Sequence, residues 1–333
     1  MTKHPELKNR AIEFTHKYGV GLGASRLVSG NLNVYESLER KIAEFKGTEA
    51  ALLLPSGYQT NTTVLAALGR KQTLIASDHE NHNSITIGIQ LSQGHWHRYK
   101  HNDVDHLQRL LQKSVDSAKW IVSESVFSMD GDVGDINALS NLATEYDALV
   151  YIDEAHATGV LGPNGRGLCS KASGVAIVMG TFSKAFGSFG AYIACSKAMK
   201  QYLINFCAGL IYSTALPPPV LGAIEAALDL VPMMDRERAK LLERSARLRA
   251  RLNKMGFSTG SSCTQIIPII VGNDVDALSL ARYLEDCAIL APAIRPPTVP
   301  EGEARIRLSL TAAHTDEHID HLLSSLKRWQ ADG

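Results

Sequence analysis

Short apolar runs and amphipathic segments alternate along the first two thirds of the chain. Six runs are apolar almost throughout, as expected of strands buried on both faces of a sheet. They are Ala50–Leu54, Thr73–Ala76, Trp120–Ser123, Leu149–Ile152, Val175–Met179 and Ala191–Ala194. Helical periodicity occupies Val34–Phe45, Asn61–Leu68, Asp103–Gln112 and Asn137–Tyr146. Strands that alternate with helices are joined by crossover connections, so the pattern predicts a mostly parallel, doubly wound α/β sheet.

The pattern changes after the three prolines at 217–219, where a smaller unit is predicted. Helical segments at Val220–Leu230 and Asp235–Leu252 lead into it. Its predicted strands and helices are Gln265–Val271, Ala277–Cys287, Ala304–Leu310 and Thr315–Trp329. A length of 333 residues also favours two domains. We therefore predict a large domain over residues 1–234 and a small C-terminal α/β domain over residues 235–333.

Composition excludes several classes of protein. Hydrophobic residues make up 45% of the chain and charged residues 20%, which excludes a disordered protein. Lys plus Arg and Asp plus Glu both number 34, so no overall basic field favours nucleic acid or an anionic membrane as a partner. The five cysteines are scattered without CxxC spacing, and the N-terminus lacks the apolar core of a signal peptide. These features predict a cytoplasmic protein with reduced thiols.

One uncharged stretch, Leu203–Ile224, is long enough to span a bilayer. Its three consecutive prolines are incompatible with the centre of a continuous helix. We therefore interpret it as a buried loop between two core helices and predict no membrane association.

Polar residues follow several predicted strands, and in an open parallel sheet ligands bind at the carboxyl ends of the strands. The polar segments are Pro55–Asn61, Glu124 with Phe127–Asp132, Asp153–His156 and Gly180–Gly187. Their common placement predicts one shared pocket.

Three features of this pocket match the needs of pyridoxal phosphate. Lys184 follows a buried strand and has the apolar neighbours Phe182 and Phe186, an environment that favours an uncharged amine able to form a Schiff base. Asp153 ends a central strand and is suited to face a cationic ring nitrogen, although such an Asp is more often a helix cap. The turn at 56–58 opens a helix, whose N-terminus is either a simple cap or a phosphate site that the hydroxyl of Thr181 completes.

Two rival functions are less well supported. Residues 153–156 read Asp-Glu-Ala-His, a magnesium motif of some helicases, but no Gly-Lys pair supplies the phosphate loop that those enzymes need. Six of the twelve histidines lie between His79 and His106, yet no carboxylate or cysteine is spaced to complete a metal site. We therefore predict no metal.

The combined motifs carry a family resemblance. The sequence resembles the α-oxoamine synthases, pyridoxal-phosphate enzymes of fold type I (aspartate-aminotransferase-like) that condense an amino acid with an acyl thioester and release carbon dioxide. The resemblance extends from about His4 to His321. The matching stretches are Gly23–Arg26, Ser56–Tyr58 with Asn61, Asn81–Ser84, His101–Asp103, Phe127–Asp132, Asp153–Gly159, Thr181–Gly187 and Tyr212–Thr214.

The resemblance implies roles for individual residues at the cofactor ring. Lys184 is expected to form the Schiff base with the cofactor. Asp153 is expected to pair with the pyridinium nitrogen and His156 with the phenolic oxygen. His82 is expected to stack on the ring, with Ser128 close by.

The resemblance also implies how the cofactor phosphate is held. Gly57, Tyr58 and Thr181 are expected to bind it. Thr214 is expected to reach the phosphate of the other subunit, because the sites of this family lie at a homodimer interface.

The C-terminal unit indicates the substrates. The stretches Ala293–Pro300 and Arg305–His314 are most similar to family members that join L-alanine to a pimeloyl thioester in biotin synthesis. By this resemblance Arg295 binds the amino-acid carboxylate in a bidentate manner, and Thr298 contacts substrate. The acyl carrier is either coenzyme A or acyl carrier protein.

Two other functions stay open. One is another synthase of the family, which joins glycine to acetyl-CoA, or serine or glycine to a different acyl-CoA. The other is a catalytically silent partner subunit, against which the presence of Lys184 argues.

The sequence departs from the family pattern in two places. Tyr35 stands where the family has a histidine, near the expected dimer interface. The family pattern also begins further upstream, with a segment that helps to bind the acyl substrate. We therefore expect this chain to bind cofactor and alanine normally and to condense the acyl group weakly.

Overall fold

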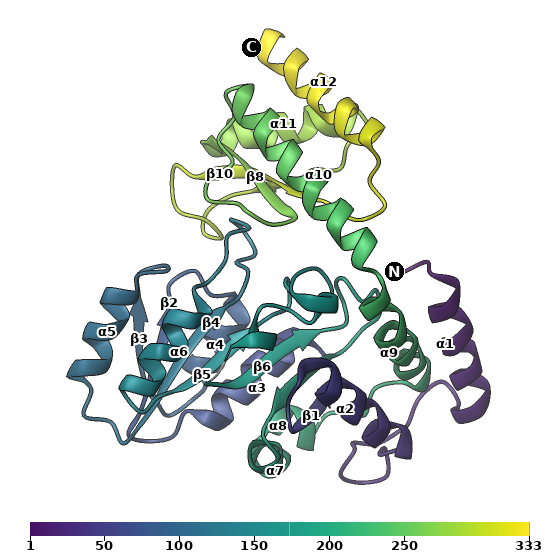
Figure 1. Cartoon of the computed structure of the whole chain (residues 1–333), viewed down its shortest axis with the longest axis vertical. Coiled ribbons are helices and arrows are strands. Elements are labelled where there is room, and N and C mark those ends of the chain that lie inside the picture. Colours follow the sequence, from purple (N-terminus) through teal and green to yellow (C-terminus); the bar gives the residue numbers. More distant parts are fainter. Residues whose placement is uncertain (173, 333) are drawn as a thin grey trace. The chain divides into compact units, whose positions relative to one another are not determined.

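The computed structural model describes residues 1–172 and 174–332, which form two compact units (Figure 1). The first unit contains Met1–Ser125 and Gly134–Met234. The second contains the remaining segment, Val126–Val133, together with the chain from Asp235 onward. The sequence pattern placed a boundary near residue 234 but did not indicate that the segment 126–133 leaves the first unit.

The first unit is built on a seven-stranded sheet with the order β1-β7-β6-β5-β4-β2-β3. The strands are β1 (Ala50–Leu54), β2 (Thr73–Asp78), β3 (His95–Tyr99), β4 (Ala118–Glu124), β5 (Leu149–Asp153), β6 (Val175–Thr181) and β7 (Ala191–Cys195). Strands β2 to β6 are parallel, whereas β7 is antiparallel to both β6 and β1. The predicted mostly parallel, doubly wound sheet is confirmed.

Helices cover both faces of this sheet (Figure 1). They are α1 (Pro5–Tyr18), α2 (Asn33–Lys46), α3 (Gly57–Leu68), α4 (Asn83–Gln90), α5 (Val104–Lys113), α6 (Ile136–Glu145), α7 (Lys197–Phe206), α8 (Ala208–Ile211) and α9 (Pro218–Leu230). Alternate strand residues enter two separate cores, so that Leu53 faces one core and Leu52 the other. One core includes side chains from α3, α4, α7 and α8, and the other includes side chains from α1, α2, α5, α6 and α9.

The uncharged stretch Leu203–Ile224 is not the buried loop that we predicted. It contains the end of α7, all of α8 and the start of α9. Pro218 lies in the first turn of α9, where a proline loses no intrahelical hydrogen bond, so the prolines begin a helix here. Tyr212 between the helices is exposed. Among the described residues, no helix is both long and apolar enough to cross a membrane.

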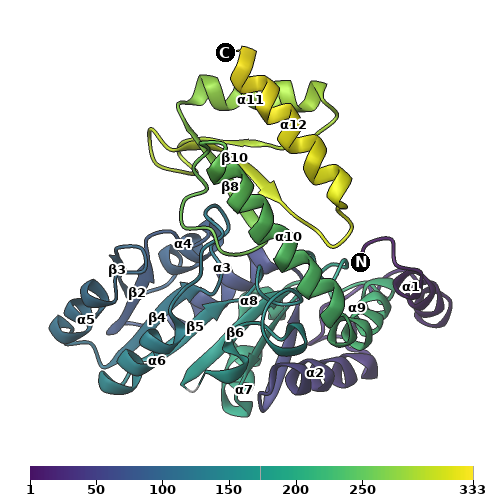
Figure 2. The same ribbon diagram turned by 45° about the horizontal axis from the view of Figure 1, so that its top comes forward.

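The second unit contains a three-stranded antiparallel sheet with the order β8-β10-β9 (Figure 2). Its strands are β8 (Ile266–Gly272), β9 (Ala293–Ile294) and β10 (Ala304–Ser309). Its helices are α10 (Asp235–Lys254), α11 (Asp274–Asp286) and α12 (Asp316–Asp332). Each strand and helix predicted for the C-terminal part is present, and β9 is an additional short strand.

Arginines of β10 hold the segment 126–133 in the second unit. Arg305 is 1% exposed and forms ion pairs with Asp130 at 2.5 Å and with Glu303. Arg307 Nε donates a hydrogen bond to the Ser128 carbonyl oxygen at 2.6 Å. A buried guanidinium requires such partners, because its desolvation is costly when it is left unpaired. The segment therefore has a fixed place beside β10.

A buried ion pair ties α2 to the loop after β5. Lys46 Nζ lies 2.5 Å from Glu154 Oε2, and both side chains are excluded from solvent. The other carboxylate oxygen of Glu154 accepts the backbone N–H groups of Leu168 and Cys169. Burial lowers the pKa of Lys46, but Tyr192 and Glu154 outweigh this effect and the pKa is raised. The amine therefore remains charged, and the pair fixes the loop.

This pair gives the first testable prediction. Lys46→Met leaves the Glu154 carboxylate buried without its cation, so we expect it to lower the free energy of unfolding by about 3–5 kcal/mol. The matched control is Lys41→Met, because Lys41 pairs with Asp229 at the exposed surface. The control should change stability by less than about 1 kcal/mol. Urea unfolding of both variants measures the difference, and equal stabilities would contradict a structural role for the buried pair.

Candidate active site

Polar side chains end three neighbouring parallel strands of the large sheet. Glu124 is the last residue of β4, Asp153 of β5 and Thr181 of β6. Because side chains alternate along a strand, Glu124 shares a face with Val122, and Asp153 with Tyr151. Val122 and Tyr151 belong to the core beneath α3 and α4. The two acidic side chains thus lie at one edge of the sheet, on the side that α3 and α4 cover.

Asp153 is held by two neutral hydrogen-bond donors and is 4% exposed. Its Oδ1 accepts the backbone N–H of Ala155 at 2.8 Å, and its Oδ2 accepts Asn61 Nδ2 at 2.8 Å. The Tyr151 hydroxyl donates to Asn61 Oδ1 at 2.6 Å, which fixes the orientation of that amide. The carboxylate plane is therefore set, and each oxygen keeps acceptor capacity for one more donor.

The same Asn61 amide connects Asp153 to His82, the N-cap residue of α4. Asn61 Nδ2 also donates to Ser84 Oγ at 2.9 Å, and Ser84 Oγ lies 2.7 Å from His82 Nδ1. The Ser84 backbone N–H donates to the same Nδ1 at 3.2 Å. A backbone N–H can only donate, so Nδ1 is the acceptor and the neutral ring carries its proton on Nε2.

Electrostatics favour this neutral state of His82. Burial lowers its pKa, and the positive charge of Lys184 lowers it further, while Asp153 acts in the opposite direction. The net shift is downward, so the imidazole is uncharged near pH 7. His82 thus presents an Nε2–H donor near Asp153 and Lys184.

Glu124 belongs to this group, although the sequence analysis gave it no role. It is 2% exposed and lies opposite Asp153 in the β4–β5 register. Its Oε1 accepts the backbone N–H of His82. Burial raises the pKa of the Glu124 carboxyl well above its usual value, and the charge of Asp153 raises it further.

Lys184 lies in the loop after β6, with its Nζ 2.8 Å from His156 Nε2. The structure differs from the prediction about its surroundings. Phe182 and Phe186 are fully buried and form an edge-to-face pair with centroids 5.3 Å apart, whereas Lys184 is exposed. The two rings point into the core because that location buries more apolar surface. They therefore do not enclose the amine.

Gly57 and Tyr58 begin α3, directly after its N-cap Ser56, whose Oγ accepts the Gln59 backbone N–H at 3.3 Å. The cap uses one of the N-terminal N–H groups and leaves others available to an anion. Thr181 lies beside this helix end, with its Oγ1 2.7 Å from the hydroxyl of Ser183. Both interpretations of the turn, cap and anion site, are compatible with this geometry.

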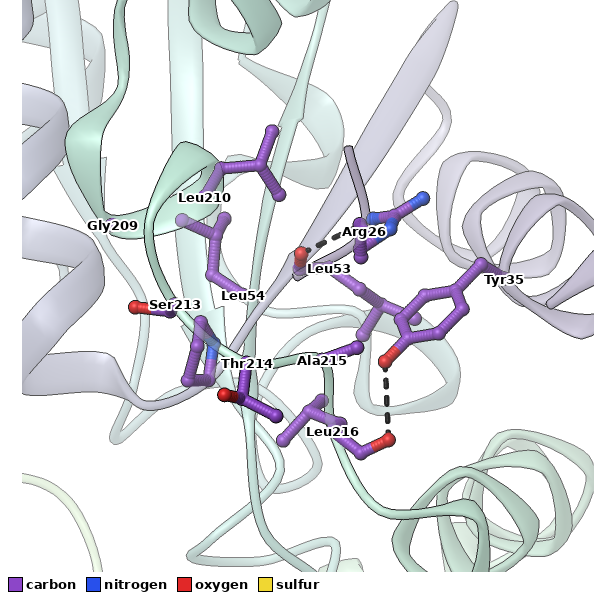
Figure 3. Close-up of a pocket in the computed structure, with 11 residues that line it drawn as sticks. Arg26, Tyr35, Leu53, Leu54, Gly209, Leu210, Ser213, Thr214, Ala215 and Leu216 are labelled. Carbon is purple, nitrogen blue, oxygen red and sulfur yellow. Dashed lines mark hydrogen bonds between the residues drawn. The ribbon is translucent and has the colours of Figure 1, made fainter. Parts of the chain in front are cut away.

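Thr214 is exposed and pairs with Ser25 in an isolated β-bridge. It lines a small pocket together with Arg26 and Tyr35 (Figure 3). The Tyr35 hydroxyl donates to the Leu216 carbonyl oxygen at 3.2 Å, and the Arg26 guanidinium lies 4.1 Å from the centre of the Tyr35 ring. Tyr35, where the resemblance led us to expect a histidine, is therefore a buried residue that stacks with Arg26.

Three predicted site residues lie in the second unit. Ser128 belongs to the segment that β10 holds. Arg295 and Thr298 are both exposed and share one turn, which the Thr298 backbone N–H closes on the Arg295 carbonyl oxygen at 3.0 Å. The turn presents the two side chains close together in sequence and space.

Four residues near Asp153 were missed as site residues: Asn61, Ser84, Glu124 and Tyr151. For two of them, the position along a predicted strand was a signal in the sequence. Glu124 ends its strand as Asp153 does, and Tyr151 precedes Asp153 by two positions on the same face. Asn61 and Ser84 stand in stretches that match the family, but the match assigned them no role, because the hydrogen bonds between α3, α4 and β5 depend on how the helices pack.

The chemistry of this donor set fits pyridoxal phosphate. The described residues offer an amine for the aldehyde, a carboxylate for the ring nitrogen, an imidazole for the phenolic oxygen and a helix N-terminus for the phosphate. Gly57 provides a structural test of the fit. A Cβ added there would lie 3.3 Å from Met179 Cε and 3.7 Å from Thr181 Cβ, so a larger residue would fill the space beside the helix end.

Comparisons with known proteins agree with this chemistry. The family model for aminotransferase class I and II matches residues 3–326. The 8-amino-7-oxononanoate synthase of Gluconacetobacter diazotrophicus is 52% identical over 336 residues, which cover 98% of this chain and 84% of that protein.

Two solved structures are also similar. Serine palmitoyltransferase of Sphingomonas wittichii has a TM-score of 0.94 at 29% identity, covering 98% of this chain and 84% of its own. The 8-amino-7-oxononanoate synthase of Francisella tularensis has a TM-score of 0.86 at 28% identity, covering 99% and 95%. The chain therefore belongs to the aminotransferase class I and II family and, within it, to the α-oxoamine synthases, which are pyridoxal-phosphate-dependent acyltransferases.

Proposed function

We propose that this enzyme condenses L-alanine with a pimeloyl thioester, carried on coenzyme A or acyl carrier protein, to form 8-amino-7-oxononanoate. In this reaction the bond from the alanine α-carbon to its carboxyl group breaks, carbon dioxide is released, a bond to the acyl carbon forms, and the thiol leaves. The single observation that carries the catalytic part of the proposal is the grouping of Asp153, His82 and the Lys184–His156 pair at one edge of the sheet. The relatives' printed names support the choice of substrates.

The cofactor, when bound, supplies an electron sink for negative charge that develops at the alanine α-carbon. In the proposal, Lys184 Nζ binds the cofactor covalently and later accepts the α-proton of alanine. Asp153 holds a proton on the ring nitrogen, and its fixed carboxylate plane orients that contact. His156 donates a hydrogen bond to the phenolic oxygen.

In this proposal His82 acts on the second substrate, the acyl thioester. Its neutral ring can stack on an aromatic cofactor without an added charge, and its Nε2–H can donate to the thioester oxygen. The backbone N–H groups of Gly57 and Tyr58, together with the Thr181 hydroxyl, bind the phosphate. Ser128 is a further residue that we assign to the cofactor ring, as the resemblance implies.

Arg295 and Thr298 are assigned to substrate recognition in this proposal. Arg295 binds the alanine carboxylate through its planar guanidinium, which allows two parallel hydrogen bonds. Thr298, on the same turn, contacts substrate. We further propose that the enzyme is a homodimer in which Thr214 of each subunit reaches the phosphate bound by the other. The exposure of Thr214 is compatible with that contact.

Borohydride reduction tests whether Lys184 is the residue that binds the cofactor covalently. Reduction of the holoenzyme should fix the cofactor to the Lys184 side chain, and mass spectrometry of a digest should find the adduct on the peptide that contains it. Lys197→Ala, a change at a neighbouring surface lysine, should leave the adduct unchanged. An adduct on another lysine would contradict the assignment.

Asp153→Asn should keep the cofactor bound, because the amide retains the size of the carboxylate and the phosphate contacts are intact. We expect the exchange of the alanine α-proton to slow by about 10²–10³-fold, since the electrostatic support of the ring proton is lost. Asp147→Asn is the control, because Asp147 is exposed in the turn before β5, at the opposite edge of the sheet from Asp153. Proton exchange is measured by NMR. A normal rate in Asp153→Asn would show that Asp153 has only a structural role and does not support the ring proton.

Recognition of alanine gives a further prediction. Spectral titration of the holoenzyme should show tighter binding of L-alanine than of glycine or serine. Arg295→Lys should weaken alanine binding about tenfold, because a lysine cannot make the bidentate contact. Arg282→Lys, at an exposed position of α11, should have no effect. A preference for serine or glycine would assign the chain to a sister reaction of the family.

A further inference from the structure

Glu124 is a buried ionisable group that the proposed reaction does not use. It ends β4 directly opposite Asp153, which ends β5. Its Oε1 accepts the backbone N–H of His82, and its side chain lies on the face beneath α4. We propose that Glu124 is a positioning residue, which stays protonated in the working enzyme and fixes the orientation of His82. The inference rests on the function proposed above for His82.

The charged and titratable groups around Glu124 come from four elements. They are Asp153 on β5, Asp78 at the end of β2, Lys184 in the loop after β6 and His82 at the N-cap of α4. Burial has the largest effect on the Glu124 pKa and raises it, and Asp153 and Asp78 act in the same direction. Lys184 and the His82 N–H act in the opposite direction without reversing the shift.

A comparison with Glu154 supports a neutral Glu124. Both side chains are buried, but Glu154 has the Lys46 ammonium and two backbone N–H groups as partners. Within the part of the chain that the structure describes, the hydrogen bond to the Glu124 carboxyl comes from one backbone N–H. A buried carboxylate with so little compensation binds a proton instead of remaining charged.

A neutral Glu124 also has a positional effect. The His82 backbone is fixed at its N–H by Glu124, and its ring is fixed at Nδ1 by Ser84. Two fixed points on one residue restrict the side-chain torsions and so direct the Nε2–H. A negative charge at Glu124 would instead compete with Asp153 for the same nearby positive groups.

The test compares holoenzyme carrying Glu124→Gln with wild type and with Glu145→Gln, an exposed residue of α6. An amide has nearly the shape of a protonated carboxyl, and its oxygen accepts the same N–H. We expect Glu124→Gln to remove an infrared carbonyl band of a protonated carboxyl that wild type and Glu145→Gln both show at pH 7. Both limbs of the kcat profile should stay within about 0.3 pH units of wild type.

A second variant tests positioning. Glu124→Ala removes the acceptor of the His82 N–H, so kcat should fall about tenfold, the effect of one lost hydrogen bond. Glu124→Gln should stay within about threefold of wild type, because it retains that hydrogen bond. If the alanine variant does not fold, the infrared and pH measurements on the glutamine variant decide alone.

Three results would overturn the proposal. They are an infrared spectrum that Glu124→Gln leaves unchanged, a limb of its pH profile moved by about one unit or more, and equal losses of kcat in both Glu124 variants. Failure of the proposed function would be recognised differently, by wild-type protein that binds no cofactor or does not turn over pimeloyl thioester. The infrared band is recorded without turnover, and it can also be recorded on protein that holds no cofactor.

Discussion

Three carboxyl groups are buried at the ends of two adjacent strands, and the surrounding structure is arranged to accommodate them. Glu154 is compensated by a full ion pair with Lys46. Asp153 is compensated by two neutral donors, one of them Asn61. Glu124 has least compensation, and its pKa is raised. Burial of three like charges so close together is too costly without this graded compensation.

The carboxyl group that stabilises the fold and the two that lie at the candidate active site are on opposite faces of the sheet. The Glu154 pair faces α2 and fixes the loop that follows β5, whereas Asp153 and Glu124 face α3 and α4. The last residue of β5 and the first residue of the loop that follows it thus lie on opposite faces of the sheet. In the proposed function, Glu154 supports the fold while Asp153, the residue before it in sequence, remains available to a ligand.

The sequence was sufficient to predict six of the seven strands of the large sheet, because strands buried on both faces are uninterrupted apolar runs that are easily recognised. The edge strand β3, most of whose residues are not buried, was not among the predicted runs. The sequence predicted strand ends less well. β2, β4, β5 and β6 continue through Asp78, Glu124, Asp153 and Thr181, since backbone pairing persists where the side chain becomes polar. The apolar criterion therefore ended each of these strands before its polar last residue.

Interactions between elements could not be predicted. The link from Asp153 through Asn61 and Ser84 to His82 depends on the packing of two helices on one face. The exposure of Lys184 also contradicts what its apolar neighbours suggested, because adjacent residues in a loop can point in opposite directions. The family resemblance supplied candidate site residues, whereas the hydrogen bonds that connect them are visible only in the structure.

The contacts between β10 and the segment 126–133 have a consequence for the order in which parts of the protein fold during synthesis. Asp130 and Arg305 are 175 positions apart in the chain. A ribosome synthesises the segment long before its arginine partners exist, and domains generally fold N-terminal first during synthesis. The large sheet can therefore form around β4 and β5 while the segment between them remains without its final contacts. The segment then gains its final contacts only when the C-terminal unit, with Arg305, has been synthesised and folds.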